Sequence, residues 1–235
     1  MIAVITSTLI PSSDVYSFFS VEERWNQTIK TIKTLFESGF ESVYLLDNSC
    51  KDFDRDALYQ QFQERLIISH QKQYTFQNKG INEALLLLNH MYLLPKDRNL
   101  FKISGRYFLV DDFNTSTAEL QLQNADFVGK GYNYKHKTGL VSTRGYFIKN
   151  TEVYENILVK AVEEMQVYGS KIHGLKSAVK SIQNIFTDTL GSPFQISMEQ
   201  AFARVIKKDH TVSLLGRLGI AGYVAGSDHL ELIEE

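Results

Sequence analysis

The 235-residue chain contains a single cysteine, Cys50. One cysteine cannot form an internal disulfide and cannot supply a cysteine-based zinc site. The six histidines are scattered through the sequence without the spacing of a metal site. The cysteine content is consistent with a reducing compartment, and we expect a cytoplasmic protein.

Long hydrophobic runs are also absent, although 43% of the residues are hydrophobic. No apolar stretch approaches the roughly 20 residues that a membrane-spanning helix needs. The N-terminal run Met1–Ile5 is too short for a secretory signal and has no positive segment before it. We therefore expect no transmembrane segment, and we interpret this run as a first, buried strand.

The chain has no excess of charge of one sign, because 25 Lys and Arg nearly balance 27 Asp and Glu and leave a formal net charge of −2. The chain therefore has no general attraction to nucleic acid or to anionic lipid, and we expect no nucleic-acid partner. Local basic segments such as 130–137 suit one small anion better than a polymer. With three prolines, no internal repeat and no linker-like segment, residues 1–235 are expected to form one domain.

The first half of the chain alternates between predicted strands and helices. Short apolar runs rich in β-branched residues predict strands, and apolar residues three or four apart predict helices. Such alternation predicts a doubly wound, mostly parallel α/β sheet that binds ligands beyond the carboxyl ends of its strands. The expected strands are 2–6, 42–46, 66–69 and 100–103, and the expected helices are 25–36, 54–64 and 81–94.

The second half has a different pattern. Two strands, 126–130 and 139–148, predict a mixed or antiparallel extension of the sheet. Helices are expected at 150–167, 172–186 and 197–207. The tail contains four glycines and is either a close-packed turn and strand or a loop that folds over a ligand; they are Gly216, Gly219, Gly222 and Gly226.

Polar residues follow three of the predicted parallel strands. Because the carboxyl ends of such strands meet at one edge of the sheet, one ligand could contact all three segments. Each segment alone also suits a turn or a loop cap, and the third also suits a β-bulge with a solvated arginine. The segments are Thr6-Ser7-Thr8, Asp47-Asn48-Ser49 and Ser104-Gly105-Arg106.

Asn78-Lys79-Gly80 precedes the helix predicted at 81–94. A helix N-terminus together with an ammonium group suits a phosphate. The same segment also suits an ordinary helix cap, with Glu83 reaching back to the backbone at the start of the helix. The two interpretations are compatible.

Further candidates lie in the second half. Thr143 and Arg144 form a second hydroxylic and cationic break in an apolar run. Glu199 lies in the first turn of a predicted helix, where the helix dipole favours its negative charge. An ionised carboxylate near a ligand cleft is a candidate general base for a substrate hydroxyl, although it can also simply stabilise its helix.

Two common nucleotide motifs are missing. No Gly-x-Gly-x-x-Gly follows the first strand, and the chain has no Gly-Lys-Ser/Thr phosphate loop. A nicotinamide dinucleotide enzyme and a nucleoside triphosphatase of that type are therefore not expected. Asp111 and Asp112 could hold a divalent cation, but adjacent carboxylates on an extended chain point to opposite sides, so one of them would serve.

The order of these motifs resembles the nucleotide-sugar glycosyltransferases with the GT-A fold. The segment 78–84, Asn-Lys-Gly-Ile-Asn-Glu-Ala, resembles the Asn-x-Gly-x-x-x-Ala helix of that superfamily with an offset. Residues 101–107, Phe-Lys-Ile-Ser-Gly-Arg-Tyr, resemble a segment of small bacterial and viral polysaccharide glycosyltransferase-like proteins. Such enzymes usually carry Asp-x-Asp at this strand end, and that motif is absent here.

The resemblance implies a Rossmann-like, nucleotide-sugar-binding half at 1–112 and an acceptor-binding half at 113–235. It implies a glycosyltransferase, of the hexosyl or a related class, that joins a nucleotide-sugar donor to a glycan acceptor in polysaccharide or surface-glycan synthesis. Its catalytic residues would be Glu199 as base and Arg106 and Lys102 as charge stabilisers. The donor would contact Thr6, Ser7, Asp47, Asn48, Lys79, Ser104 and Gly105, and the acceptor would contact Thr143 and Arg144.

The metal requirement stays open at this point. Either Asp111 or Asp112 holds Mg²⁺ or Mn²⁺, or no metal is used and Lys102 and Arg106 supply the charge that a metal would provide.

Two alternatives to a glycosyltransferase remain. A sugar nucleotidyltransferase would make an activated sugar, but such enzymes usually carry a Gly- and Arg-rich loop after the first strand, and residues 6–13 contain neither residue. A catalytically degenerate nucleotide- or glycan-binding module is the other alternative. Four tyrosines could contact a sugar or a partner, including a second copy of the chain; they are Tyr132, Tyr134, Tyr146 and Tyr154.

Overall fold

The computed structural model describes residues 1–12, 18–72, 74, 76, 78–136, 139–170, 179, 196–225 and 230–235. The helix expected at 172–186 lies outside the described residues, apart from position 179. None of the described helices is both long enough and apolar enough to cross a membrane.

The described strands from both halves of the chain form two sheets, one of seven strands and one of three. The first half contributes β1 (Ile2–Ser7), β2 (Val43–Asp47), β3 (Leu66–His70), β4 (Leu100–Ser104) and β5 (Tyr107–Leu109). The second half contributes β6 (Phe127–Tyr132), β7 (Leu140–Ile148), β8 (Val212–Leu214), β9 (Ile220–Ala225) and β10 (Leu230–Glu234).

The seven-stranded sheet has the order β3-β2-β1-β4-β7-β6-β8. Strands β1 to β4 pair in parallel, whereas β7 is antiparallel to both β4 and β6. A smaller sheet has the order β10-β9-β5. The expected α/β fold, with a parallel first half and a mixed extension, is therefore confirmed.

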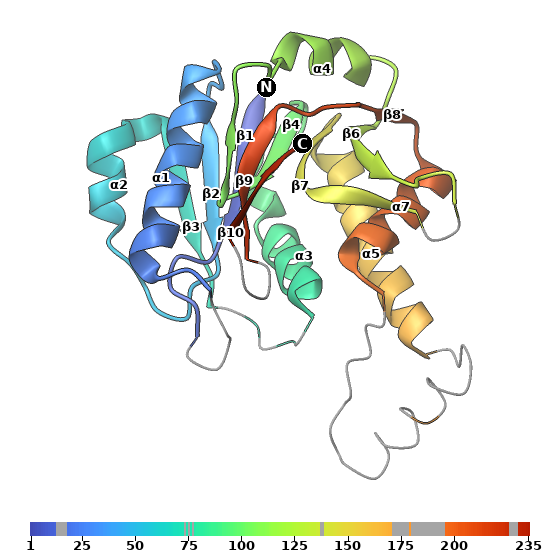
Figure 1. Cartoon of the computed structure of the whole chain (residues 1–235), viewed down its shortest axis with the longest axis horizontal. Coiled ribbons are helices and arrows are strands. Elements are labelled where there is room, and N and C mark those ends of the chain that lie inside the picture. Colours follow the sequence, from blue (N-terminus) through green and yellow to red (C-terminus); the bar gives the residue numbers. More distant parts are fainter. Residues whose placement is uncertain are drawn as a thin grey trace.

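Helices cover both faces of the large sheet (Figure 1). The helices are α1 (Val21–Glu37), α2 (Arg55–Phe62), α3 (Lys79–Asn89), α4 (Thr115–Leu122), α5 (Thr151–Ser170) and α7 (Met198–Asp209). Buried residues of α3, α5 and α7 pack in one core cluster, and those of α1, α2 and α4 pack in a second. Short 3₁₀ helices at Gln63–Arg65 and Met91–Leu93 follow α2 and α3.

Local sequence explains where the helices begin. Ser20 caps α1 in a reciprocal arrangement with Glu23, in which each side chain accepts a hydrogen bond from the other residue's backbone N–H. Side chains of Asp54, Asn78 and Ser197 likewise accept backbone hydrogen bonds at the starts of α2, α3 and α7. These caps fix the entry of each chain segment at the edge where the parallel strands end.

Two regions differ from the simple alternation. Strand β4 belongs to the large sheet, and after the turn at Gly105 the chain continues as β5, which pairs with β9 in the small sheet. The described part of the tail forms strands β9 and β10, so a close-packed strand is confirmed there over a loop. Gly226 lies outside the described residues. Helix α4 was not expected from the sequence.

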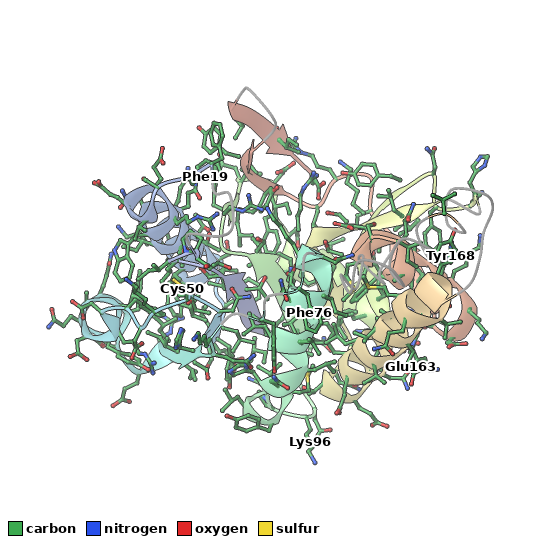
Figure 2. All side chains as sticks on the ribbon, turned by 90° about the horizontal axis from the view of Figure 1, so that it is seen from below. Phe19, Cys50, Phe76, Lys96, Glu163 and Tyr168 are labelled. Atoms are coloured by element: carbon green, nitrogen blue, oxygen red, sulfur yellow. The ribbon has the colours of Figure 1, made fainter. Side chains whose placement is uncertain are left out.

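In Figure 1 the N-terminus lies at the upper end of β1, so this strand runs downward and its carboxyl end faces the bottom of the view. Figure 2 looks at the molecule from below and labels Cys50, in the loop after β2, and Phe76, just before α3. Loops and helix starts from separate parts of the chain therefore gather at this edge.

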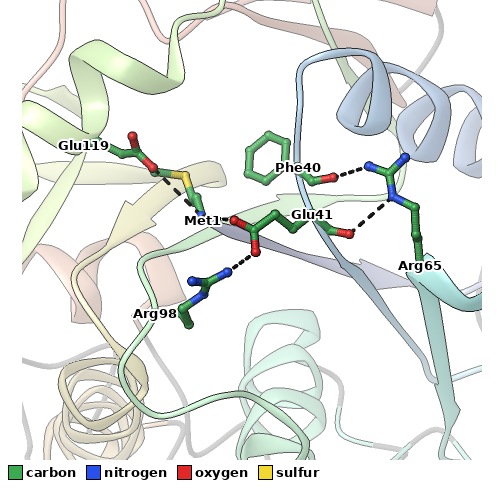
Figure 3. Close-up of polar contacts among 6 residues, drawn as sticks. All are labelled: Met1, Phe40, Glu41, Arg65, Arg98 and Glu119. Atoms are coloured by element: carbon green, nitrogen blue, oxygen red, sulfur yellow. Dashed lines mark hydrogen bonds and ion pairs between the residues drawn. The ribbon is translucent and has the colours of Figure 1, made fainter.

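A cluster of charged residues joins neighbouring segments elsewhere in the molecule (Figure 3). The Glu41 carboxylate pairs with Arg98 and lies 4.0 Å from the Met1 amino group. Arg65 donates a hydrogen bond of 2.6 Å to the carbonyl of Phe40. These contacts join the segment before β2 to the segments before β3 and β4.

Candidate functional site

The structure brings six of the seven predicted donor-binding residues, together with the predicted catalytic residue Arg106, around one cavity of about 180 Å³. The register explains why: Thr6 pairs with Leu46 of β2 and with Ser104 of β4, so the three strands end at the same level. The seven predicted residues that line the cavity are Thr6, Ser7, Asn48, Lys79, Ser104, Gly105 and Arg106.

The turn that carries Arg106 is held by α1 and β1. The Gly105 N–H donates to the carbonyl of Thr6 at 2.9 Å. Thr28 and Thr31 of α1 donate to the carbonyl of Gly105, at 3.3 and 3.2 Å. A Cβ at Gly105 would lie 3.2 Å from the Thr28 hydroxyl oxygen and 3.3 Å from Ser7 Cβ, which is tighter than ordinary packing. The turn is therefore fixed before any ligand arrives.

Asp47 does not line the cavity. Its carboxylate is fully buried and accepts hydrogen bonds from the backbone N–H groups of Leu9, at 2.9 Å, and Ser49, at 2.8 Å. Burial raises its pKa, while these hydrogen bonds act in the opposite direction. Asp47 thus holds the loop after β1 against the loop after β2, a contact that positions neighbouring Asn48.

Lys102 is also away from the cavity lining. Its side chain is only 1% exposed, its ammonium forms an ion pair with Glu83, and it donates to the carbonyl of Thr143 at 2.6 Å. The ammonium lies 5.6 Å from the centre of the Tyr146 ring. Lys102 therefore contacts the cavity only through Glu83, which does line it.

Glu83 does not cap its own helix, which corrects the expectation from the sequence. Asn78 caps α3 instead, through hydrogen bonds from the N–H groups of Gly80 and Ile81. Glu83 accepts a hydrogen bond of 2.8 Å from the Thr6 hydroxyl and pairs with Lys102. Helix α3 thereby brings a carboxylate to the end of β1.

Glu199 lies in the first turn of α7, as expected, and is half-buried. Its carboxylate accepts a hydrogen bond of 3.2 Å from the Thr143 hydroxyl. Neither residue lines the cavity. Because the carbonyl of Thr143 binds Lys102, polar contacts run continuously from Thr6 through Glu83, Lys102 and Thr143 to Glu199.

Arg144 faces a different partner. It forms an ion pair with Glu235, whose side chain is 1% exposed and also accepts hydrogen bonds from Ser142 and Tyr132. Burial and the hydrogen bond to Glu235 raise the pKa of Tyr132. In this structure Arg144 joins β7 to the end of β10 and does not line the cavity.

Two of the four tyrosines expected to contact a sugar or a partner belong to the core, so that expectation was wrong for them. Tyr146 and Tyr154 are 1% and 0% exposed, and their hydroxyl groups hydrogen-bond each other at 2.8 Å. Burial raises both pKa values well above the usual range.

Sequence reasoning missed Arg24 of α1, which lines the cavity. Its guanidinium donates to the carbonyl of Thr8 at 2.9 Å. Burial, followed by repulsion from Arg106, lowers the pKa of Arg24. The only signal in the sequence is a cation one turn into the helix that follows the first strand.

Asn82 was also missed. It lines the cavity and is 5% exposed; its amide nitrogen donates to the carbonyl of Phe76 at 2.8 Å. Its side-chain oxygen is buried and accepts no hydrogen bond from the described part of the chain. A buried acceptor without a donor costs free energy, so this atom suits a ligand hydroxyl or N–H.

Asp111 and Asp112 lie elsewhere, in a surface depression with Lys30 and Arg217. Asp112 pairs with Arg217 at 3.0 Å. Among residues 1–12, 18–72 and the other described ranges, no group of three or more His, Cys, Asp or Glu side chains could hold a metal ion.

Comparisons with known proteins identify the fold but not a sequence family. No family model matches the chain, and no curated protein matches it. The galactosyltransferase LgtC, solved with donor and acceptor sugar analogs, aligns with a TM-score of 0.54 and 8% identity, covering 97% of this chain and 88% of that chain. An active-site mutant of LgtC aligns with a TM-score of 0.54 and 9% identity, over 96% of this chain and 88% of that one.

A nucleoside-diphosphate-sugar pyrophosphorylase from Vibrio cholerae RC9 aligns with a TM-score of 0.51 and 10% identity, over 94% of this chain and 95% of that chain. At such low identity the likeness concerns the fold alone. The chain therefore has an α/β Rossmann-like fold similar to that of LgtC and of this pyrophosphorylase.

Proposed function

We propose that the protein is a glycosyltransferase that moves a sugar from a nucleotide diphosphate sugar to a hydroxyl of a glycan acceptor, in polysaccharide or surface-glycan synthesis. The observation that carries this proposal is the cavity at the carboxyl ends of β1, β2 and β4. Hydroxyl, amide and cationic side chains line it, as a nucleotide with its phosphates would require. The fold similarity to LgtC adds support.

In this reaction the bond between the anomeric carbon and the diphosphate oxygen breaks, and a bond from that carbon to the acceptor oxygen forms. The nucleoside diphosphate leaves, and the acceptor proton passes to a base. Thr6, Ser7 and Asn48 would contact the nucleoside, and Arg106 and Lys79 would stabilise the negative charge that develops on the leaving group.

Glu199 is our candidate for the base, and Thr143 would orient it through the 3.2 Å hydrogen bond. Arg144, paired with Glu235, would shape the acceptor side. Lys102 would act through Glu83 and not by contact with the diphosphate, because its ammonium already binds Glu83 and Thr143.

A nucleotidyltransferase is the second candidate, and its support is the fold similarity to the pyrophosphorylase. The two reactions consume different substrates. A glycosyltransferase hydrolyses a bound nucleotide sugar slowly and releases free sugar, whereas a nucleotidyltransferase releases pyrophosphate from a nucleoside triphosphate and a sugar 1-phosphate.

The test is product analysis by liquid chromatography after incubation of the protein with UDP-, GDP- and dTDP-sugars. In a separate incubation, the protein is given the corresponding nucleoside triphosphates together with sugar 1-phosphates. We expect free sugar and nucleoside diphosphate, lost in Arg106→Gln and retained in the surface variant Lys208→Gln. Pyrophosphate release would favour the nucleotidyltransferase. Nucleotide binding without either product, in the presence of candidate glycan acceptors, would favour a degenerate binding module.

A further inference from the structure

The end of β4 carries no carboxylate that could hold a divalent cation. Mg²⁺ and Mn²⁺ prefer carboxylate, carbonyl and water oxygens. Where the GT-A family usually carries Asp-x-Asp, this chain has Ser104-Gly105-Arg106, and the guanidinium would repel a cation. Glu83 is the only carboxylate among the described residues that line the cavity, and one of its oxygens already binds both Thr6 and Lys102. The described residues around this cavity therefore do not fit the family's metal.

Three cationic side chains from separate elements line this cavity instead. Arg24 comes from α1, Lys79 begins α3, and Arg106 follows β4. Within the described part of the chain, neither Lys79 nor Arg106 forms an ion pair, and Arg24 is close enough to Arg106 for the two charges to repel. Like charges gathered around one cavity destabilise the empty site, and a bound anion relieves that repulsion.

Lys102 preserves this positive charge. Without it, Glu83 would place an unpaired carboxylate in the cavity and would repel an anion. The ammonium of Lys102 forms this pair from the core side of Glu83. Lys102 is 1% exposed and does not line the cavity. The charge on the anion side therefore stays with Arg24, Lys79 and Arg106.

One unused acceptor atom indicates that the ligand also carries a hydrogen-bond donor such as a hydroxyl group. The Asn82 side-chain oxygen is buried beside the cavity and has no donor in the described structure. Ribose and sugar hydroxyls can donate a hydrogen bond to this oxygen, whereas the ionised oxygens of a diphosphate can only accept one.

We propose that this cavity binds the diphosphate of its nucleotide directly through Arg24, Lys79 and Arg106, without a divalent cation. The inference rests on the proposed function, because it specifies how that donor is held. It predicts that affinity depends on the three cations and on salt, and not on Mg²⁺ or Mn²⁺.

The experiment is calorimetric titration with UDP, GDP, CDP and dTDP, each in EDTA and each with Mn²⁺. For the nucleotide that binds, we expect dissociation constants in the two buffers that agree within about twofold. Hydrogen bonds between charged groups contribute more binding free energy than neutral ones. Arg106→Gln and Lys79→Gln should therefore each weaken nucleotide binding in EDTA by about tenfold or more. Lys208→Gln changes a charge in a separate surface groove and should leave the affinity unchanged.

Pyrophosphate in EDTA is the second probe, because it tests the cationic site without a nucleoside. Thermal stabilisation by pyrophosphate that is lost in Arg106→Gln supports a metal-free diphosphate site; if no nucleotide binds as well, that site stands and the proposed function, with its nucleotide, fails. Nucleotide binding that requires Mn²⁺ overturns the inference and leaves the proposed function intact. Absence of binding by nucleotides and pyrophosphate alike, with or without Mn²⁺, overturns both.

Discussion

Lys102, on a central strand, forms an ion pair with Glu83 on helix α3, and the same carboxylate oxygen of Glu83 accepts a hydrogen bond from Thr6. Lys102 is 1% exposed and Glu83 is 29% exposed, so the pair joins the core to the cavity. A charge in a core is costly unless it is paired, so this contact constrains both stability and the site.

Replacing Lys102 with methionine should lower the free energy of unfolding by about 3 kcal/mol, because it leaves Glu83 without its partner. Because Glu83 is partly exposed, this loss of stability lies at the lower end of the range for breaking a buried ion pair. Adding Glu83→Gln should recover part of it. The measurement is a double-mutant cycle in urea.

The control is Lys160→Met, which breaks an exposed pair with Asp209 and should cost about 1 kcal/mol or less. Equal losses in the two lysine variants would contradict a special role for the buried pair.

Asp47→Asn tests the buried carboxylate that holds the loop after β1. Its raised pKa means that the folded protein holds the Asp47 proton more tightly than the unfolded chain does. Asp47 therefore lowers stability as pH rises from its ordinary pKa of about 3.9 through the folded value. Asparagine does not ionise, so the stability of Asp47→Asn relative to wild type should increase over that pH window, as measured by urea unfolding.

Exposed Asp52 serves as the matched control, since its hydrogen bond with Arg55 lowers its pKa. The stability of Asp52→Asn relative to wild type should change with the opposite sign, decreasing as pH rises through the lowered pKa. If both variants showed the same slope, the assignment for Asp47 would be wrong.

Glu199→Gln should reduce turnover by about 10²- to 10⁴-fold if Glu199 is the general base, because the acceptor proton would have no recipient. Its nucleotide affinity should be unchanged, since Glu199 does not line the cavity. Single-turnover rates and calorimetry separate the two effects. Glu152→Gln removes a similar first-turn carboxylate from α5 and should leave turnover intact. Unchanged turnover in Glu199→Gln would leave this residue with a purely structural role.

Gly80 lies where α3 packs against α7. A Cβ there would lie 2.6 Å from the Cβ of Met198, and neither atom is the end of a flexible side chain. Gly80→Ala should therefore push the two helices apart and lower stability by about 1–3 kcal/mol. Gly216→Ala meets no atom within 4 Å and should have little effect on the melting temperature. An unchanged stability in Gly80→Ala would contradict this prediction and would show that the two helices can move apart without loss of stability.

Much of the fold was determined by local sequence. Apolar β-branched runs specified β1, β2 and β4, and capping residues such as Ser20 and Asn78 specified where α1 and α3 begin. Because parallel strands end at one edge, polar residues after each strand predicted a common cavity before the structure was known. Helix α4 was missed because its sequence has little apolar periodicity beyond Ala118 and Leu122.

The partners of individual side chains were decided only by the tertiary structure. Strand β4 is buried on both faces, so its sequence carries no alternation to show which way Lys102 points. Its partner Glu83 lies on a helix whose rotation depends on how α3 packs on the sheet. Arg144 and Glu235 are 91 positions apart and meet because β10 returns to the core. Local patterns determine elements and their ends, whereas contacts between elements depend on packing that no short stretch of sequence encodes.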